Sequence, residues 1–358
     1  DKGRDGKTTE KKKTMRIGIV TPFVLYHSFA QYFDEKDRDE LLALKQNDNA
    51  PIPSVIAQGL IQKGHFVRLF TNGQQNRVFR SEKVEIVTVR CDYRVIAHLR
   101  LYELHELQLA YKMSRVSGNH LEDLDLLHAH WTYYTALAAG RHAKRLPVFC
   151  TVRDWCPTIR TFLPDGGGKQ WKVKHWENEL TFRNKHIHFI GNSPYTQQLI
   201  EGKTHKEVPF IMNPIDDACL ACGEKARPDH LHILCVSSSI DRRKNITRLL
   251  EAYRLVRKEE PTATLTCLFG YSINQDTNPF FVHWREQGLL DGVEILFGAG
   301  HEEVLHHIDR ATLTVSPSLE ETFGNTIVES MARRTPVVGG KESGAVPFLL
   351  DFGTRGYV

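Results

Sequence analysis

The sequence has no long apolar run, which excludes several classes of protein. No stretch of its 358 residues approaches the roughly 18 to 20 consecutive apolar residues that a membrane-spanning helix needs. No apolar segment of a secretory signal peptide follows the start. Apolar residues make up 41% and charged residues 25%, which is typical of a soluble globular protein. We therefore expect a cytoplasmic protein, and the length suits two domains.

The sequence also lacks a regular set of metal or disulfide ligands. Its seven cysteines are odd in number and several lie in apolar runs, which indicates reduced thiols. Cys219 and Cys222 form a C-x-x-C pair, but no second pair of ligands lies nearby. His301 and His306 resemble a zinc-protease helix, but they are five residues apart and do not share a helix face. We expect no bound metal.

Little excess charge remains once the first residues are set aside. The formal net charge is +4, and residues 1–14 hold six bases and three acids, which leaves +1 for the rest. Residues 1–14 contain no apolar side chain, so we expect a disordered leader or an added sequence, with Met15 as the natural start. The remaining charge gives no support for nucleic acid as a partner.

Short apolar runs alternate with amphipathic segments along residues 15–212. This alternation predicts βαβ units and a parallel sheet covered by helices on both faces. The predicted helices are Ser54–Gln62, Ala97–Ser114 and Thr132–Arg145. The predicted strands are Arg16–Thr21, Phe66–Thr71, Val84–Val89, Leu124–His130, Pro147–Val152 and His188–Asn192.

The alternation restarts after residues 213–230, a polar stretch that we interpret as a linker. The second domain, residues 231–358, has predicted helices Ile246–Lys258, Glu302–Arg310 and Thr326–Arg333. Two such sheets in tandem place a ligand-binding cleft between the domains. Two long loops, Phe23–Ala50 and Leu163–Lys174, are expected at the carboxyl ends of strands, where such folds carry function. The predicted strands are Leu231–Val236, Thr264–Phe269, Val293–Phe297, Leu313–Ser316 and Pro336–Val338.

The segment Ser316–Ala332, with the sequence SPSLEETFGNTIVESMA, runs from a predicted strand through a loop into a helix. Gly324 lets the backbone approach a ligand closely, and the N–H groups at the helix start would face an anion. Glu321 on the loop can accept hydrogen bonds from sugar hydroxyls. Glu329 in the helix can hold a ribose diol with both carboxylate oxygens. The alternative is a pair of solvated glutamates beside an ordinary helix start.

This segment resembles the retaining GT-B glycosyltransferases of family 4, whose pattern is P-S-x-x-E-x-F-G-x-x-x-x-E-x-M-A followed by T-P-V-V. Thr335–Val338 supplies the second part, Gly64–Val67 matches G-H-x-V, and Lys244 with Asn245 matches K-N. Ile211–Asp216 resembles I-P-N-G-V-D, with proline in place of glycine. The resemblance implies an α/β fold of two tandem Rossmann-like doubly wound domains with a cleft between them.

The resemblance also implies a reaction. The enzyme would move a sugar from a nucleoside-diphosphate sugar, held mainly by the C-terminal domain, to a hydroxyl of a glycan or lipid-linked acceptor. It would need no metal or other cofactor. His130 and Glu321 are the implied catalytic residues. The implied donor-binding residues are Arg243, Lys244, Phe323, Gly324, Asn325, Thr326 and Glu329.

Several of these residues have alternative interpretations. Lys244 would meet the donor diphosphate, or it could be a solvated lysine at a helix start. His130 would line the reaction centre, but it could be a core histidine or pair with His128 on a metal. Arg153 and Asp154 occupy positions where many relatives carry His-Asp. The guanidinium could bind a phosphate oxygen or could pair with Asp154.

The sequence departs from the family pattern at further places. Ser237–Ser239 replaces a Gly-Arg pair, so that Arg242 or Arg243 would have to supply the second diphosphate clamp. Arg334 occupies a position that is usually glycine. The chain ends where relatives have further helices, so we expect a truncated C-terminal domain. A donor-binding module without turnover and a sugar-nucleotide epimerase therefore stay open as alternatives. The lack of G-x-G-x-x-G after any predicted strand disfavours a nicotinamide oxidoreductase.

The segment Gly167–Lys185 combines basic residues with two tryptophans, Trp171 and Trp176. Such a segment suits an anionic membrane surface or a phosphate-linked lipid acceptor, and it predicts peripheral membrane contact. The alternative is a solvated helix with both tryptophans packed inward. Its bases are Lys169, Lys172, Lys174, Arg183 and Lys185, against the acids Glu177 and Glu179.

Overall fold

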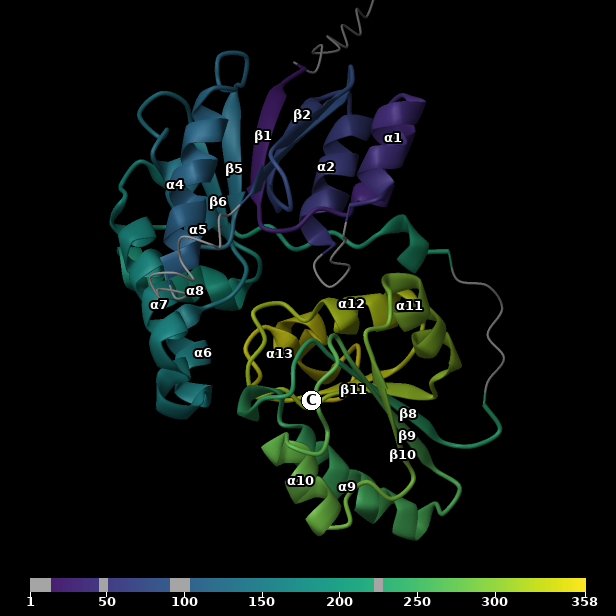
Figure 1. Cartoon of the computed structure of the whole chain (residues 1–358). Helices are drawn as coiled ribbons and strands as arrows, with labels where there is room; N and C mark the ends of the chain where they lie inside the picture. The colour runs from purple at the N-terminus through teal and green to yellow at the C-terminus, as the bar shows by residue number, and fades with distance from the viewer. Residues whose placement is uncertain (1–13, 45–50, 91–103, 222–227) are drawn as a thin grey trace, which may run out of the picture.

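The chain forms two lobes, each built on one β-sheet with helices on its faces (Figure 1). A computed structural model describes residues 14–44, 51–90, 104–221 and 228–358. All but one residue of the predicted leader lie outside these ranges, as do Cys222 and part of the predicted helix Ala97–Ser114. No helix in the described ranges combines the length and the apolar character that a membrane span requires.

The N-terminal sheet has the strand order β3-β4-β2-β1-β5-β6-β7. Its strands are parallel except for β3, which pairs antiparallel with β4 at one edge. The carboxyl ends of β5 and β6 therefore lie side by side, with His130 beside Thr151. The strands are β1 (Arg16–Thr21), β2 (Phe66–Gly73), β3 (Arg77–Arg80), β4 (Val84–Arg90), β5 (Leu126–His130), β6 (Val148–Val152) and β7 (Ile187–Gly191).

Helices cover both faces of this sheet, as the apolar strands require. One apolar cluster joins the strands to α2 and the 3-10 helix η1, and includes Ile19, Leu69 and Ile61. A second cluster on the other face joins them to α4 and α5, and includes Leu127 and Ala136. The elements are η1 (Tyr26–Tyr32), α1 (Glu35–Leu42), α2 (Ile52–Gln62), α4 (His105–Gly118), α5 (Tyr134–Gly140), α6 (Cys156–Phe162), η3 (Pro164–Gly167), α7 (Gly168–Arg183) and α8 (Pro194–Thr204).

The C-terminal sheet is parallel, with the strand order β10-β9-β8-β11-β12. The order reverses between β8 and β11, so the loops after these two strands diverge and leave a crevice where ligands bind in such folds. Its strands are β8 (His232–Ser237), β9 (Thr264–Phe269), β10 (Val293–Phe297), β11 (Leu313–Ser316) and β12 (Val337–Gly339). Its helical elements are η4 (Asp217–Cys219), η5 (Arg242–Lys244), α9 (Ile246–Glu259), α10 (Pro279–Glu286), α11 (His301–Arg310), α12 (Asn325–Ala332), α13 (Val346–Leu349) and η6 (Asp351–Gly353).

The predicted α/β architecture is confirmed, and each predicted strand begins and ends within two residues of its observed place. The two predicted long loops are wrong in part. The first contains η1 and α1, a polar helix that Asp34 caps by accepting a hydrogen bond from the Asp37 N–H at 2.9 Å. In the second, α7 begins at Gly168, and the glycines before it have the positive φ that a sharp turn needs. The predicted domain boundaries stay a prediction.

The loop before α12 joins the two lobes through side chains. The Thr322 hydroxyl donates to the carbonyl of Arg153 at 2.7 Å, and the Ser193 hydroxyl donates to the carbonyl of Thr322 at 2.6 Å. The Asn213 amide donates to Asn325 Oδ1 at 2.9 Å. These contacts bring the end of β6 next to the start of α12, which places residues from both domains around one space.

Candidate functional site

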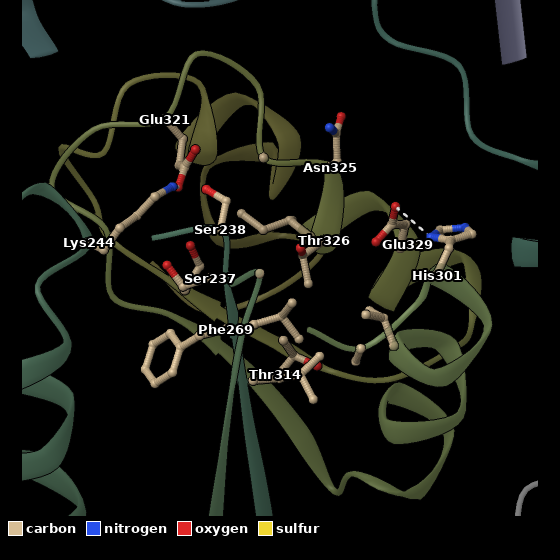
Figure 2. A pocket seen from close by; sticks show the side chains of 18 of the residues that line it. Ser237, Ser238, Lys244, Phe269, His301, Thr314, Glu321, Asn325, Thr326 and Glu329 are labelled. Atoms are coloured by element: carbon tan, nitrogen blue, oxygen red, sulfur yellow. Dashed lines mark hydrogen bonds and ion pairs between the residues drawn. The ribbon is translucent and has the colours of Figure 1, made fainter. Parts of the chain in front are cut away.

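A cavity of about 190 Å³ lies in the C-terminal domain, at the carboxyl ends of β8 and β11 and the start of α12. We call it the inner cavity. Figure 2 shows Lys244 and Glu321 on one side of it and Glu329 with His301 on the other. Thr326 lies between them. Two carboxylates and one ammonium therefore surround a space that the start of a helix also lines.

Lys244 and Glu321 form a largely buried ion pair. The Nζ–Oε1 distance is 2.5 Å, and only 6% of Lys244 is exposed, so the alternative of a solvated lysine is wrong. The Ser318 hydroxyl donates to the same carboxylate oxygen at 2.8 Å. Burial acts to raise the pKa of Glu321, but Lys244 and Arg243 outweigh it and hold that pKa below its usual value. The pair is therefore ionised at neutral pH.

Gly324 begins α12 in a backbone conformation that favours glycine. Its φ is +100°, and an added Cβ would lie 3.1 Å from Ile327 Cδ1. The first N–H groups of any helix have no partner within that helix, so Asn325 and Thr326 present donors toward the cavity. Phe323 is buried and lines the neighbouring interdomain space instead. The sequence motif thus places a helix start, a structure that in general favours anions, opposite Lys244.

Glu329 is buried at the far end of the inner cavity. Its Oε1 lies 4.0 Å from His301 Nδ1, and Cys219 Sγ lies 3.8 Å from His301 Nε2. Burial raises the pKa of Glu329, although His301 opposes the shift. One potential ligand atom from each of these three side chains lies within 4.8 Å of the others. The expectation of a site without metal therefore stays a prediction.

A second cavity, of about 590 Å³, lies between the domains, and we call it the cleft cavity. Lys244, Glu321 and Asn325 line both cavities, so the two spaces adjoin. Together the two cavities have a volume typical of sites that bind a drug-sized ligand. Its charged and aromatic lining residues are Trp131, Arg153, Asp154, Trp171, Asp241, Arg243, Lys244, Tyr271, Glu320, Glu321 and Phe323.

The structure places His130 behind the cleft wall. His128 and His130 share a face of β5, with ring centroids 4.3 Å apart. His130 Nδ1 accepts a hydrogen bond from Arg153 Nε at 3.0 Å, so the ring is neutral. Burial, the neighbouring His128 and Arg153 lower the pKa of His130 well below its usual value. His130 contacts Arg153, which itself lines the cleft cavity.

Arg153 and Asp154 have separate partners. Arg153 Nη1 donates to Asn213 Oδ1 at 2.6 Å, and its Nε donates to His130. Asp154 Oδ1 accepts from the Tyr133 hydroxyl at 2.9 Å. Burial raises the pKa of Asp154 to about 6. Of the two interpretations of Arg153, pairing with Asp154 is thus not the arrangement that forms.

Sequence reasoning missed several residues of this site. Glu320 is buried next to Arg243, with 3.5 Å between Oε2 and Nη1, and burial raises its pKa to about 7. Trp131 lines the cleft cavity with a φ of +67°, which is rare outside glycine and marks strain at a site. His301 was considered only as part of a protease-like pattern. The polar Asn213 could have been found, because it belongs to the family-like motif Ile211–Asp216.

Helix α7 contradicts one interpretation of its sequence, and the predicted membrane contact stays a prediction. Lys174 lies 2.6 Å from Glu106 and 4.5 Å from the Tyr133 ring centre, so it is not a surface charge. Trp176 is 49% exposed, so the interpretation with both tryptophans packed inward is wrong. Trp171 lines the cleft cavity. Lys169 and Lys172 remain exposed.

Comparisons with known proteins agree with this architecture. Residues 55–218 match the family described as Glycosyltransferase Family 4, and residues 223–358 match Glycosyl transferases group 1. N-acetyl-alpha-D-glucosaminyl L-malate synthase of Bacillus anthracis is 23% identical, over 85% of this chain and 78% of that protein.

Two solved structures have a similar fold. One is sucrose-phosphate synthase from Thermosynechococcus elongatus, with a TM-score of 0.63 and 14% identity over 92% of this chain and 82% of that chain. The other is an alpha,alpha-trehalose-phosphate synthase (UDP-forming) from Burkholderia vietnamiensis, with a TM-score of 0.64 and 11% identity over 93% and 84%. The family matches, the two-sheet architecture and the inner cavity lead to one conclusion: the chain belongs to the GT-B glycosyltransferases of family 4.

Proposed function

We propose that this glycosyltransferase moves a sugar, with retention of configuration, from a nucleoside-diphosphate sugar to an acceptor hydroxyl. The observation that supports this most is the arrangement of the inner cavity. Lys244 lies at one end of it and Glu329 at the other, with Thr326 at the start of α12 between them. This arrangement suits a diphosphate and a ribose diol within one ligand.

The diphosphate would lie between Lys244 and the N–H groups at the start of α12. Lys244 is already held by Glu321 and does not need to be ordered when the ligand binds. Arg243, which lines the cleft cavity, is the candidate for the second clamp that the Ser237–Ser239 stretch does not supply. These groups provide the positive charge that stabilises a departing diphosphate, and we propose no metal for this step.

Catalysis would rest on positioning and electrostatics. Glu321 lines both cavities, so its free carboxylate oxygen is placed to accept a hydrogen bond from the donor sugar. His130 would act through Arg153, whose guanidinium it holds, and is thus a positioning residue. Interactions that strengthen as the glycosidic bond breaks lower the barrier more than uniform binding does.

The acceptor would enter through the cleft cavity, on the N-terminal side. A glycan or a lipid-linked sugar fits the proposal equally. The exposed Lys169, Lys172 and Trp176 on α7 favour contact of this side with an anionic membrane surface from the cytoplasm.

The deciding experiment measures the release of nucleoside diphosphate from UDP-, GDP- and ADP-sugars with and without acceptors. Release that depends on an acceptor, with the anomeric configuration kept in the product by NMR, is expected. Binding without release would indicate a donor-binding module, and conversion of the sugar without release would indicate an epimerase. Lys244→Met should abolish release, while Lys258→Met, at an exposed residue of α9, serves as the matched control.

A further inference from the structure

The charges that line the cleft cavity are mostly paired. Lys244 pairs with Glu321 at 2.5 Å, and Arg243 lies 3.5 Å from a carboxylate oxygen of Glu320. Asp154 is satisfied by the hydroxyl of Tyr133 and not by a cation. This leaves Arg153 as the lining cation whose partners carry no charge.

Within the described residues, both hydrogen-bond partners of the Arg153 guanidinium are neutral. Nε donates to His130, whose acceptor nitrogen cannot carry a proton, and Nη1 donates to the amide oxygen of Asn213. Within the described ranges no carboxylate oxygen lies within the 4.0 Å of an ion pair with Arg153. Burial lowers the pKa of Arg153 to about 9, so the group is still charged at neutral pH.

A cation in this position lowers the stability of the fold. Only 9% of Arg153 is exposed, and a buried charge without a counter-ion destabilises the folded state. The surrounding residues nevertheless hold it firmly. Asn213 is itself bonded to Asn325 in α12, and the Trp131 ring centre lies 5.9 Å from Arg153 Cζ. The guanidinium is thus fixed at the wall of the cleft cavity, and Nη2 has no hydrogen-bond partner among the described residues.

We propose that Arg153 forms a subsite for a carboxylate or phosphate group carried by one of the two sugar substrates. This rests on the proposed function, because the cleft cavity must be where donor sugar and acceptor meet. The guanidinium presents N–H groups on Nη1 and Nη2 in the planar fork that matches such anions. The anion belongs either to a uronic-acid sugar on the donor or to an acid or sugar phosphate as the acceptor. The diphosphate is bound elsewhere, by Lys244 and α12.

The test compares wild type with Arg153→Gln, Arg153→Lys and the control Arg145→Gln, at an exposed residue of the same domain. Two ligand pairs distinguish the sources of the anion. UDP-glucuronic acid against UDP-glucose tests the donor, and glucose 6-phosphate against glucose, with and without UDP, tests the acceptor. Binding is measured by calorimetry.

In wild type, the charged member of one pair should bind about 10-fold or more tightly than the neutral member. Arg153→Gln should reduce this preference to near unity, and Arg153→Lys should retain part of it. The proposal is overturned if wild type prefers neither charged ligand, or if Arg153→Gln weakens charged and neutral ligands equally. The proposal is also overturned if Arg153→Gln loses as much affinity for UDP alone as for the charged ligands, because that result would assign Arg153 to the diphosphate.

Thermal unfolding keeps this inference separate from the proposed function. Without ligand, Arg153→Gln should unfold at the same or a higher temperature than wild type, whereas a structural role would lower that temperature. Inorganic phosphate should stabilise wild type and Arg145→Gln more than Arg153→Gln, in which only the proposed diphosphate site at Lys244 and α12 remains. If no nucleotide binds, the proposed function fails, yet phosphate stabilisation that depends on Arg153 would still support the subsite. Equal stabilisation of all variants by phosphate would contradict it.

Discussion

The two walls of the cleft treat their buried charges differently. On the C-terminal wall, Lys244 is ion-paired with Glu321, and Arg243 lies next to Glu320. On the N-terminal wall, Arg153 is held by neutral groups. On the C-terminal wall each cation has a carboxylate as counter-ion in the protein. On the N-terminal wall the charge of Arg153 would be compensated only when an anionic ligand binds.

This difference separates two kinds of substrate recognition. A nucleoside diphosphate is common to many donors, so a preformed site can serve it. The variable part of the two substrates distinguishes one enzyme from another, and on the N-terminal wall Arg153 stands where many relatives carry histidine. We therefore propose that affinity for the common part and selectivity for the variable part lie on different domains.

Breaking the balanced pair should have the largest effect. Lys244→Met leaves the carboxylate of Glu321, whose side chain is 18% exposed, without its cation. Loss of one partner of a largely buried pair costs up to about 3–5 kcal/mol of unfolding free energy. Lys244→Met/Glu321→Gln should recover most of that stability but none of the nucleotide affinity. Urea denaturation and calorimetry measure the two quantities. A double variant as unstable as the single one would show that the pair is not what stabilises this wall.

Turnover should fall sharply when either wall loses its positioning groups. Glu321→Gln and His130→Ala should lower kcat about 100-fold or more and change donor affinity far less. The reason is that the proposed contacts of Glu321, and of the Arg153 that His130 holds, strengthen as the glycosidic bond breaks. His130→Ala acts by releasing Arg153, so His130→Asn, which keeps an acceptor, should retain more activity. Steady-state kinetics that show a raised KM at constant kcat would contradict these roles.

The pH dependence of the unfolding free energy should reveal a buried carboxyl group on the C-terminal wall. Burial raises the pKa of Glu320 from 4.5 to about 7, so the folded state binds this proton more tightly than the unfolded state. Its contribution therefore favours the folded state at low pH and is lost as the pH rises from about 4.5 to 7. Glu320→Gln should reduce the change in unfolding free energy over this window by on the order of 3 kcal/mol. The exposed Glu303→Gln is the control, and equal profiles for the two variants would refute the assignment.

The membrane proposal predicts the smallest effect. Lys169→Glu/Lys172→Glu should weaken the free energy of binding to anionic liposomes, measured by co-sedimentation, by about 1 kcal/mol per residue. Binding of the wild type should fall as the salt concentration rises. Lys174 is left unchanged because it pairs with Glu106 inside the protein. Equal partitioning of wild type and variant would remove α7 as a membrane contact.

The strands could be predicted from the sequence because buried parallel strands are uninterrupted apolar runs. The polar helix α1 could not, since none but Leu41 of its residues is buried and no apolar period marks it. Helix α8 did carry a signal, with Pro194 at its start and a capping box between Ser193 and Thr196. The left-handed φ of +58° at Arg334 explains why glycine is usual there.

The site was predictable where one motif holds neighbouring residues, as in the loop around Gly324. It was less so where the partners are far apart in the chain. Asn213 lies 60 residues from Arg153 and 112 from Asn325, yet it contacts both. Nor did the sequence indicate which cation would be paired, because pairing depends on how the two domains meet.

The most direct test of the account is calorimetric titration of UDP, GDP and ADP into wild type, Glu329→Ala and the exposed control Glu303→Ala. The account places Glu329 at the ribose, so one nucleotide should bind wild type and the control equally. Its affinity for Glu329→Ala should be weaker by about 1.5–3 kcal/mol, the usual loss of hydrogen bonds to a charged acceptor. Unchanged affinity of Glu329→Ala, or no binding of any nucleotide to wild type, would contradict the central claim that the inner cavity holds the donor.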